Sequence, residues 1–108
     1  MSLAKTETVL NSIRSLGRQV IPVGGQLWLY GSRARGDNRP DSDWDLLVLL
    51  DKPQRAFSDF DNYSFPFIEL GASLGQTISA HTYTVSEWNS MSFTPFYHNV
   101  ERDRKVLV

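Results

Sequence analysis

The sequence predicts an α/β (α+β) fold, in which a small mixed sheet packs with helices. Helix-like and strand-like patterns alternate along the chain, which is typical of layered α/β proteins. The strand-like run at residues 43–50 ends in Leu46-Leu47-Val48-Leu49-Leu50, and an apolar run without alternation indicates a strand covered on both faces. A chain of 108 residues suits one compact domain, so we expect a single domain over residues 1–108.

The first third of the chain predicts a helix followed by a strand. Apolar residues recur at helical spacing before a Gly-rich break at residues 24–25. Thr6 is suited to cap this helix and Gly17 to end it. Residues 26–30, Gln-Leu-Trp-Leu-Tyr, are typical of a strand that ends at Gly31-Ser32. A short helix or turn follows, and then a tight loop at residues 38–41.

The remainder predicts two further strands and three helices. Residues 64–74 favour a helix with Ser64 as its cap, and residues 77–84 favour a strand. A short helix starts at Ser86, and a second one, capped by Thr94, covers residues 96–103. Residues 105–108 form a short final strand or tail, whereas residues 54–62 show no clear pattern.

Composition limits the classes of function. The net charge is −1, whereas proteins that hold long nucleic acid usually carry a basic surplus, so no long nucleic acid is expected. No cysteine is present, which excludes disulfides and zinc–thiolate sites. No apolar run approaches the roughly 20 residues that span a bilayer, and the N-terminus lacks the apolar region of a signal peptide. We therefore expect a cytoplasmic protein.

Two carboxylates form a candidate metal site. Successive residues of a strand point to opposite faces, so Asp43 and Asp45 should project together while Trp44 projects into the core. Two neighbouring carboxylates repel each other, and a divalent cation between them relieves the repulsion. Mg²⁺, or Mn²⁺, prefers such hard oxygen ligands and usually adds the phosphates of a substrate. The alternative interpretation is a solvated strand end beside a polar loop.

The turn before these acids is suited to bind phosphate. Gly31 lets the backbone approach an anion closely. Ser32 offers a hydroxyl and, if a helix starts there, a free backbone N–H. Arg33 or Arg35 could neutralise further charge on the phosphates. Ser42 directly precedes the first acid.

At these residues the chain resembles the DNA polymerase beta nucleotidyltransferase superfamily, and within it the minimal nucleotidyltransferases. Their pattern is Gly-Ser-x-Ala-Arg-Gly, a loop, and then Ser-Asp-x-Asp-Leu. The matching residues are Gly31, Ser32, Ala34, Arg35, Gly36, Ser42, Asp43, Asp45 and Leu46. The resemblance covers about residues 27–50 closely, and residues 83–88 more loosely as the third strand running into a helix.

The resemblance implies the nucleotidyltransferase fold and the transfer of a nucleoside monophosphate, usually AMP from ATP, to an acceptor hydroxyl. It implies that Asp43 and Asp45 are catalytic and bind magnesium. It also implies that Gly31 and Ser32 hold the triphosphate, with Arg35 and Ser42 as further nucleotide-binding residues. Minimal nucleotidyltransferases often pair with a HEPN-type toxin as antitoxins, so a protein partner of this type is expected.

The chain departs from the superfamily pattern at the third strand. Active members usually carry a third carboxylate there, whereas residues 76–84 contain no acid. Ser79 or His81 would face the site, and His81 is either a general base or a packed residue. The nearest acid in sequence, Glu69, should lie on the preceding helix. His98 is interpreted as structural. Whether Asp37 or Asp41 replaces the missing acid is left open.

Three functional hypotheses follow. The first is a magnesium-dependent nucleotidyltransferase that acts on a hydroxyl of a protein or small molecule. The second is a catalytically weak nucleotide-binding module that masks a HEPN-type partner, because the second metal would lack a ligand. The third, a nucleic-acid-binding domain, is disfavoured by the net charge. The C-terminal aromatics either fill the core, which we favour, or form an interface; they are Trp88, Phe93, Phe96 and Tyr97.

Overall fold

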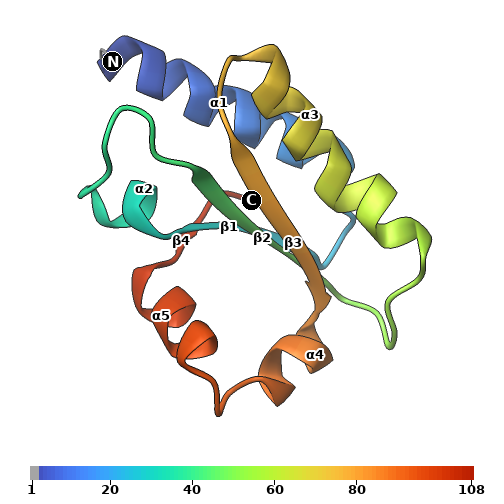
Figure 1. The fold of residues 1–108 in the computed structure, drawn as a ribbon. Coiled ribbons are helices and arrows are strands. Elements are labelled where there is room, and N and C mark those ends of the chain that lie inside the picture. Colours follow the sequence, from blue (N-terminus) through green and yellow to red (C-terminus); the bar gives the residue numbers. More distant parts are fainter. Residues whose placement is uncertain (1–2) are drawn as a thin grey trace.

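A computed structural model describes the backbone of residues 3–108 and the side chains of residues 5–108. It confirms the predicted α/β architecture (Figure 1). The helices are α1 Leu3–Val20, α2 Ser32–Arg35, the π-helix η1 Phe60–Ser64, α3 Phe65–Ser73, α4 Val85–Ser90 and α5 Pro95–Asp103. The strands are β1 Gln26–Tyr30, β2 Trp44–Leu50, β3 Ile78–Thr84 and β4 Lys105–Val106.

The four strands form one mixed sheet in the order β3-β2-β1-β4. Strand β2 runs antiparallel to β1 and parallel to β3, and β4 pairs antiparallel with β1. The register sets Asp45 opposite Tyr30 on β1 and opposite Ser79 on β3. The sheet therefore fixes which side chains flank Asp45.

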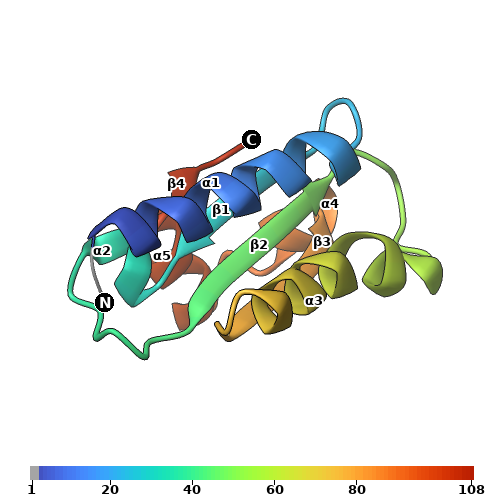
Figure 2. The same ribbon diagram turned by 90° about the horizontal axis from the view of Figure 1, so that it is seen from above.

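Helices cover both faces of the sheet, as the apolar run in β2 predicts. Helices α1 and α3 lie along one face (Figure 2), where Leu46, Val48 and Leu50 join their core cluster. On the opposite face Leu47 and Leu49 pack in a second cluster with residues of α4 and α5. Within the described residues, no helix is long and apolar enough to cross a membrane.

Trp88 is the centre of the second cluster. Its ring is 2% exposed, meets the ring of Trp28 edge-on at 6.0 Å, and lies 5.0 Å from that of Tyr97. Its indole N–H donates to Glu101 at 2.8 Å. The core interpretation is thus confirmed for Trp88 and for the partly buried Tyr97 and Phe96. It is wrong for Phe93, which is 85% exposed.

The limits predicted for the first helix are wrong at both ends. Helix α1 begins at Leu3, so Thr6 lies inside it, and it continues to Val20. Gly17 does not end the helix. A Cβ at this position would approach side-chain atoms of Leu27 and Val108 to 2.8 Å. Gly17 therefore lets α1 pack closely on β1 and on the C-terminal residues.

Ser64 does not cap its helix with its side chain. The helical path is already present at residues 58–62, for which the sequence shows no pattern, and η1 runs directly into α3. The Ser64 hydroxyl instead shares a hydrogen bond of 2.7 Å with the Thr82 hydroxyl. Thr94 does cap α5 as predicted, whereas α4 starts one residue before Ser86 and is capped by Thr84 through a capping box.

Candidate functional site

Asp43 and Asp45 lie at the start of β2. The strand begins at Trp44, one residue later than predicted, so Asp43 is the last residue of the preceding loop. Asp43 is exposed, Asp45 is partly buried, and Trp44 is 2% exposed on the opposite face of the sheet. The predicted alternation around Trp44 is therefore present.

The environment of Asp45 disfavours its negative charge. Burial raises the pKa of Asp45, and the negative charge of Asp43 raises it further, while His81 and Arg35 lower it.

Two mutually repelling carboxylates with hard oxygen donors fit a divalent cation such as Mg²⁺ or Mn²⁺. Among the described residues, however, no third acidic, histidine or cysteine side chain completes a group of ligands.

Gly31 brings the turn after β1 against Asp45. Its backbone has φ 73° and ψ −159°, a conformation essentially restricted to glycine. A Cβ at this position would collide with the Asp45 carboxylate. Helix α2 starts directly afterwards at Ser32, and the N–H groups of Ala34 and Arg35 both donate to the Gly31 carbonyl at 3.0 Å. The predicted turn and the predicted metal site are therefore in contact.

Arg33 is not available to bind phosphate. It is 8% exposed, and its Nη2 donates to the carbonyls of Pro40 at 3.1 Å and Ser42 at 3.0 Å. Its guanidinium lies 4.5 Å above the centre of the Trp44 ring. Burial lowers the pKa of Arg33, while the negative charge of Asp41 acts in the opposite direction and raises it. Arg33 thus fixes the residues on either side of Asp43, which corrects its interpretation as a candidate phosphate ligand.

Replacing Arg33 with Met is expected to lower the free energy of unfolding by about 2–3 kcal/mol, because the carbonyls of Pro40 and Ser42 lose their donor in a partly buried site. Urea denaturation of the variant measures this loss. Arg39→Met serves as the control, since Arg39 is an exposed residue of the same loop. An equal loss in both variants would contradict the role of Arg33.

Arg35 joins α2 to the end of α5. Its Nε donates to Asp37 at 3.0 Å and its Nη1 to Asp103 at 2.9 Å. Hydrogen bonds from Arg102 and Arg35 lower the pKa of Asp103 to about 2. Asp103 was missed by sequence reasoning, because it lies 68 residues from Arg35. Asp37 is paired with this arginine and does not join Asp43 and Asp45 in a group of ligands.

Ser42 holds the loop before β2. Its Oγ accepts a hydrogen bond from the backbone N–H of Arg39 at 2.8 Å, and its carbonyl accepts from Arg33. These contacts place Ser42 directly beside Asp43 in a defined conformation. Its predicted role in nucleotide binding stays a prediction.

Strand β3 brings Ser79 and His81 to the site, as predicted. Ser79 pairs with Asp45 in the register, and His81 follows two residues later on the same face. The Ser79 Oγ lies 3.5 Å from the His81 Nε2. Glu69 is exposed on α3, which covers the opposite face. His98 is exposed on α5 with its ring against Tyr97 at 5.5 Å.

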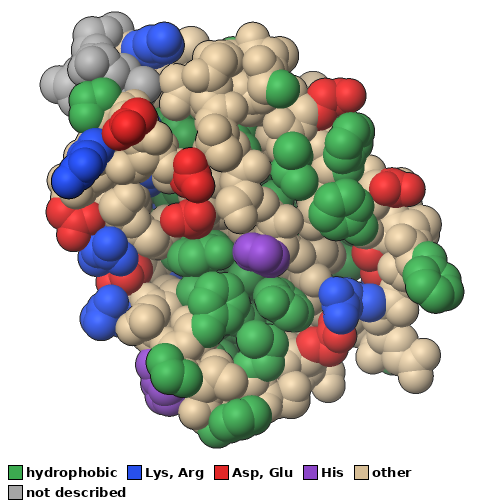
Figure 3. All heavy atoms as spheres, viewed as in Figure 1, with side chains coloured by type: hydrophobic (Ala, Val, Ile, Leu, Met, Phe, Trp, Pro, Cys, Tyr) green, Lys and Arg blue, Asp and Glu red, His purple; other side chains and the backbone are tan. Residues whose placement is uncertain are grey.

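Tyr30 is a further neighbour of Asp45 that the sequence did not reveal. It pairs with Asp45 across β1 and β2, and its ring meets the Phe96 ring edge-on at 5.8 Å. Burial raises the pKa of Tyr30, and the charges of Asp45 and Tyr83 raise it further. Its phenol therefore stays protonated. Figure 3 shows acidic side chains, a histidine and an apolar patch side by side on this face.

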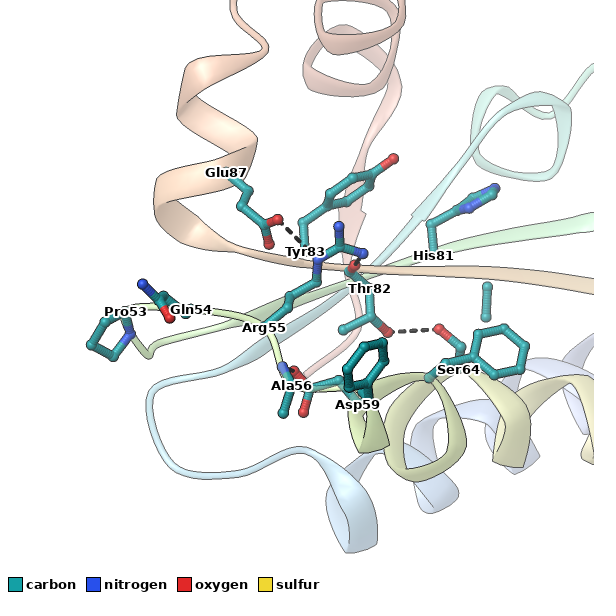
Figure 4. Close-up of a pocket in the computed structure, with 13 residues that line it drawn as sticks. Pro53, Gln54, Arg55, Ala56, Asp59, Ser64, His81, Thr82, Tyr83 and Glu87 are labelled. Atoms are coloured by element: carbon teal, nitrogen blue, oxygen red, sulfur yellow. Dashed lines mark hydrogen bonds and ion pairs between the residues drawn. The ribbon is translucent and has the colours of Figure 1, made fainter.

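A cavity of about 910 Å³ lies along the outer edge of β3. It is lined by residues of the segment 53–60, by Ser64, by residues 80–83 of β3 and by Glu87. Figure 4 shows this segment on one side of β3 and α4 on the other. We call this cavity the β3-edge groove. Asp43 and Asp45 are not among its lining residues. His81 does line it, and the interaction of His81 with Asp45 lowers the pKa of Asp45.

A solved structure shares this fold. It is described as the crystal structure of a toxin–antitoxin with AMP-PNP, and it has 20% sequence identity and a TM-score of 0.60 with this chain. The match covers 92% of this chain and 72% of the other one. No individual curated protein matches the chain at a significant level.

A family model, the nucleotidyltransferase domain, matches residues 7–107. This range includes all four strands and every residue of the predicted site. The chain therefore belongs to the nucleotidyltransferase domain family of the DNA polymerase beta superfamily.

Proposed function

We propose that residues 1–108 form a single domain that transfers a nucleoside monophosphate, AMP from ATP in the first instance, to a hydroxyl of a protein or small molecule. One observation carries the proposal. The glycine turn that opens α2 touches the carboxylate of Asp45, which Asp43 already repels. This close approach supports one site in which the turn would bind phosphate and the two carboxylates would bind a cation.

Each residue has a role in this proposal. Asp43 and Asp45 hold Mg²⁺ or Mn²⁺, which when bound neutralises charge on the phosphates. Gly31 and Ser32 hold the triphosphate. Arg35 and Ser42 complete the nucleotide site, with Arg35 kept in place by its ion pair to Asp103. Tyr30 offers a protonated phenol next to Asp45.

The proposed reaction is an in-line displacement at the α-phosphorus. The acceptor oxygen forms a bond to this phosphorus, the bond to the bridging oxygen breaks, and pyrophosphate leaves with the electron pair. The acceptor proton passes to a base, and His81 is the base that β3 offers beside Asp45.

Calorimetric titration of ATP, with Mg²⁺ or Mn²⁺ present, tests the proposal. The wild type is expected to bind ATP only with metal, and the Asp43→Ala, Asp45→Ala double variant is expected to bind none. Asp41→Ala is the matched control, because Asp41 is an exposed acid of the same loop. Absence of binding by the wild type would reject the proposed site.

A second candidate function is a module that binds nucleotide, transfers it poorly and masks a HEPN-type partner. It is favoured by the missing acid on β3, since the described residues contain no third ligand. Incubation of the chain and the product of an adjacent reading frame with ATP labelled at the α- or the γ-phosphate separates the two functions. Transfer predicts that only the α-label stays on the acceptor, whereas masking predicts a stable complex without label.

A further inference from the structure

The β3-edge groove presents no free charge along most of its length. Arg55 donates to Glu87 at 2.9 Å, and Asp59 accepts from Lys52 at 2.7 Å (Figure 4 shows the first pair). These pairs neutralise the cation and both anions that line the groove. His81, at the end near Asp45, is the remaining titratable side chain of basic character in the lining. A charged ligand would meet no unpaired counter-charge, so an occupant of the groove should be uncharged.

The rim of the groove is apolar and extends beyond the cavity. Phe57 is 107% exposed and Phe60 is 52% exposed, and both belong to the lining. Exposed aromatic rings beside a concave site are typical of interfaces between proteins. A small molecule inside the cavity would leave the outer sides of these rings in water. A polypeptide that fills the cavity and crosses the rim would cover them.

The backbone of β3 also favours a polypeptide. Strand β3 is the outer strand of the four-stranded sheet. Its Thr82 carbonyl faces the groove, where it accepts a long hydrogen bond of 3.4 Å from Arg55. An extended segment beside an outer strand gains backbone hydrogen bonds, while its side chains enter pockets at alternate positions. Residues 80–83 of this outer strand line the groove, so a segment bound there would lie beside the strand.

We propose that the β3-edge groove binds an extended, uncharged segment of a partner protein through a bulky apolar side chain that packs between Phe57 and Phe60. His81 lines the groove and interacts electrostatically with Asp45, so the bound segment passes close to Asp45. The partner is then the acceptor of the nucleotide or is held next to it. This last step rests on the proposed function, whereas the docking itself does not.

A phage-displayed library of random peptides, selected on the intact chain, tests the docking. The enriched peptides are expected to share an apolar anchor and to carry little charge. The affinity of a labelled selected peptide is then measured by fluorescence polarisation. The Phe57→Asp, Phe60→Asp double variant is expected to bind it about tenfold more weakly or worse, since the loss of anchor contacts dominates such interfaces. Phe93→Asp is the control, because Phe93 is also an exposed aromatic residue but lies outside the groove.

Three results would overturn the proposal: no enriched peptide, enriched peptides dominated by charge, or equal affinity for both variants. Sedimentation equilibrium provides a fourth, because a wild-type dimer that the double variant dissociates would identify a second copy as the occupant. Both Phe positions are exposed, so the variants should keep the wild-type melting temperature. Metal-dependent ATP binding is measured in parallel. Its absence, with peptide binding retained, would reject the proposed function but not the docking.

Discussion

Replacing Asp45 with Asn is expected to remove metal-dependent ATP binding and, at neutral pH, to make the protein more stable. The ionised carboxylate is partly buried and faces Asp43, and both effects raise its pKa. Asn has nearly the same shape but carries no charge, so the repulsion disappears. The gain should be about 1 kcal/mol or less, because Asp45 is partly solvated. Loss of a metal ligand should weaken ATP binding by about two orders of magnitude or more.

The pH dependence gives this prediction a defined sign. A raised pKa means that the folded state holds the Asp45 proton at pH values where the unfolded state, with an ordinary pKa of 3.8, has lost it. The stability of the wild type relative to Asp45→Asn therefore falls as the pH rises through this window. Well below pH 3.8 the carboxyl is protonated in both states, and the two proteins should be about equally stable.

Thermal unfolding at a series of pH values, together with titration of Mn²⁺ and ATP, measures both effects. Asp41→Asn is the control, because Asp41 is an exposed acid of the same loop. A variant that is less stable than the wild type at neutral pH would show that Asp45 makes favourable contacts in the free protein. A variant that still binds ATP with metal would show that Asp45 is not a ligand.

Those parts of the site that depend on adjacent residues were predictable. The alternation of Asp43, Trp44 and Asp45 follows from the geometry of a strand, and the unbroken apolar run after them requires cover on both faces. Gly31 follows from its place between a strand and a helix. Each of these signals lies within a few residues of the feature that it predicts.

Features that depend on distant contacts were not predictable. Gly17 resembles a helix terminator, but its role comes from Leu27 and Val108, which pack against it. Arg35 reaches Asp103 only because α5 returns to α2. Arg33 and Arg35 are two residues apart in the same motif, and only the folded loop shows that one is buried and the other exposed.

The β3-edge groove was also beyond the sequence. Its wall is the segment at residues 53–60, which has no clear periodicity, and its floor is the edge of a strand whose position depends on β2. The register of β3 against β2 likewise decides that Ser79 is the β3 residue that lies beside Asp45. The absence of an acid on this strand could be read from the sequence, whereas the absence of a third ligand from any other described element needed the fold.

Replacing Gly31 with Ala is expected to damage both stability and nucleotide binding. The Gly31 conformation, φ 73° and ψ −159°, costs a residue with a Cβ about 1–3 kcal/mol. The added methyl would also collide with the Asp45 carboxylate. Relief of this collision requires Asp45 or the turn to move, so the total loss of unfolding free energy should be about 2–4 kcal/mol.

Gly75→Ala separates the two contributions. Gly75 also has a positive φ, 68°, but a Cβ there meets nothing within 4 Å. The Gly75→Ala variant should lose only the free energy of holding a residue with a Cβ in this backbone conformation, about 1 kcal/mol. Its ATP binding should be unchanged. Denaturant unfolding and calorimetric titration of ATP with Mn²⁺ on both variants test this difference. Equal losses of stability, with ATP binding kept in Gly31→Ala, would mean that the close approach of the turn to Asp45 is not needed to hold the nucleotide. The contact between turn and carboxylate, on which the proposed site depends, would then be a feature of the fold alone.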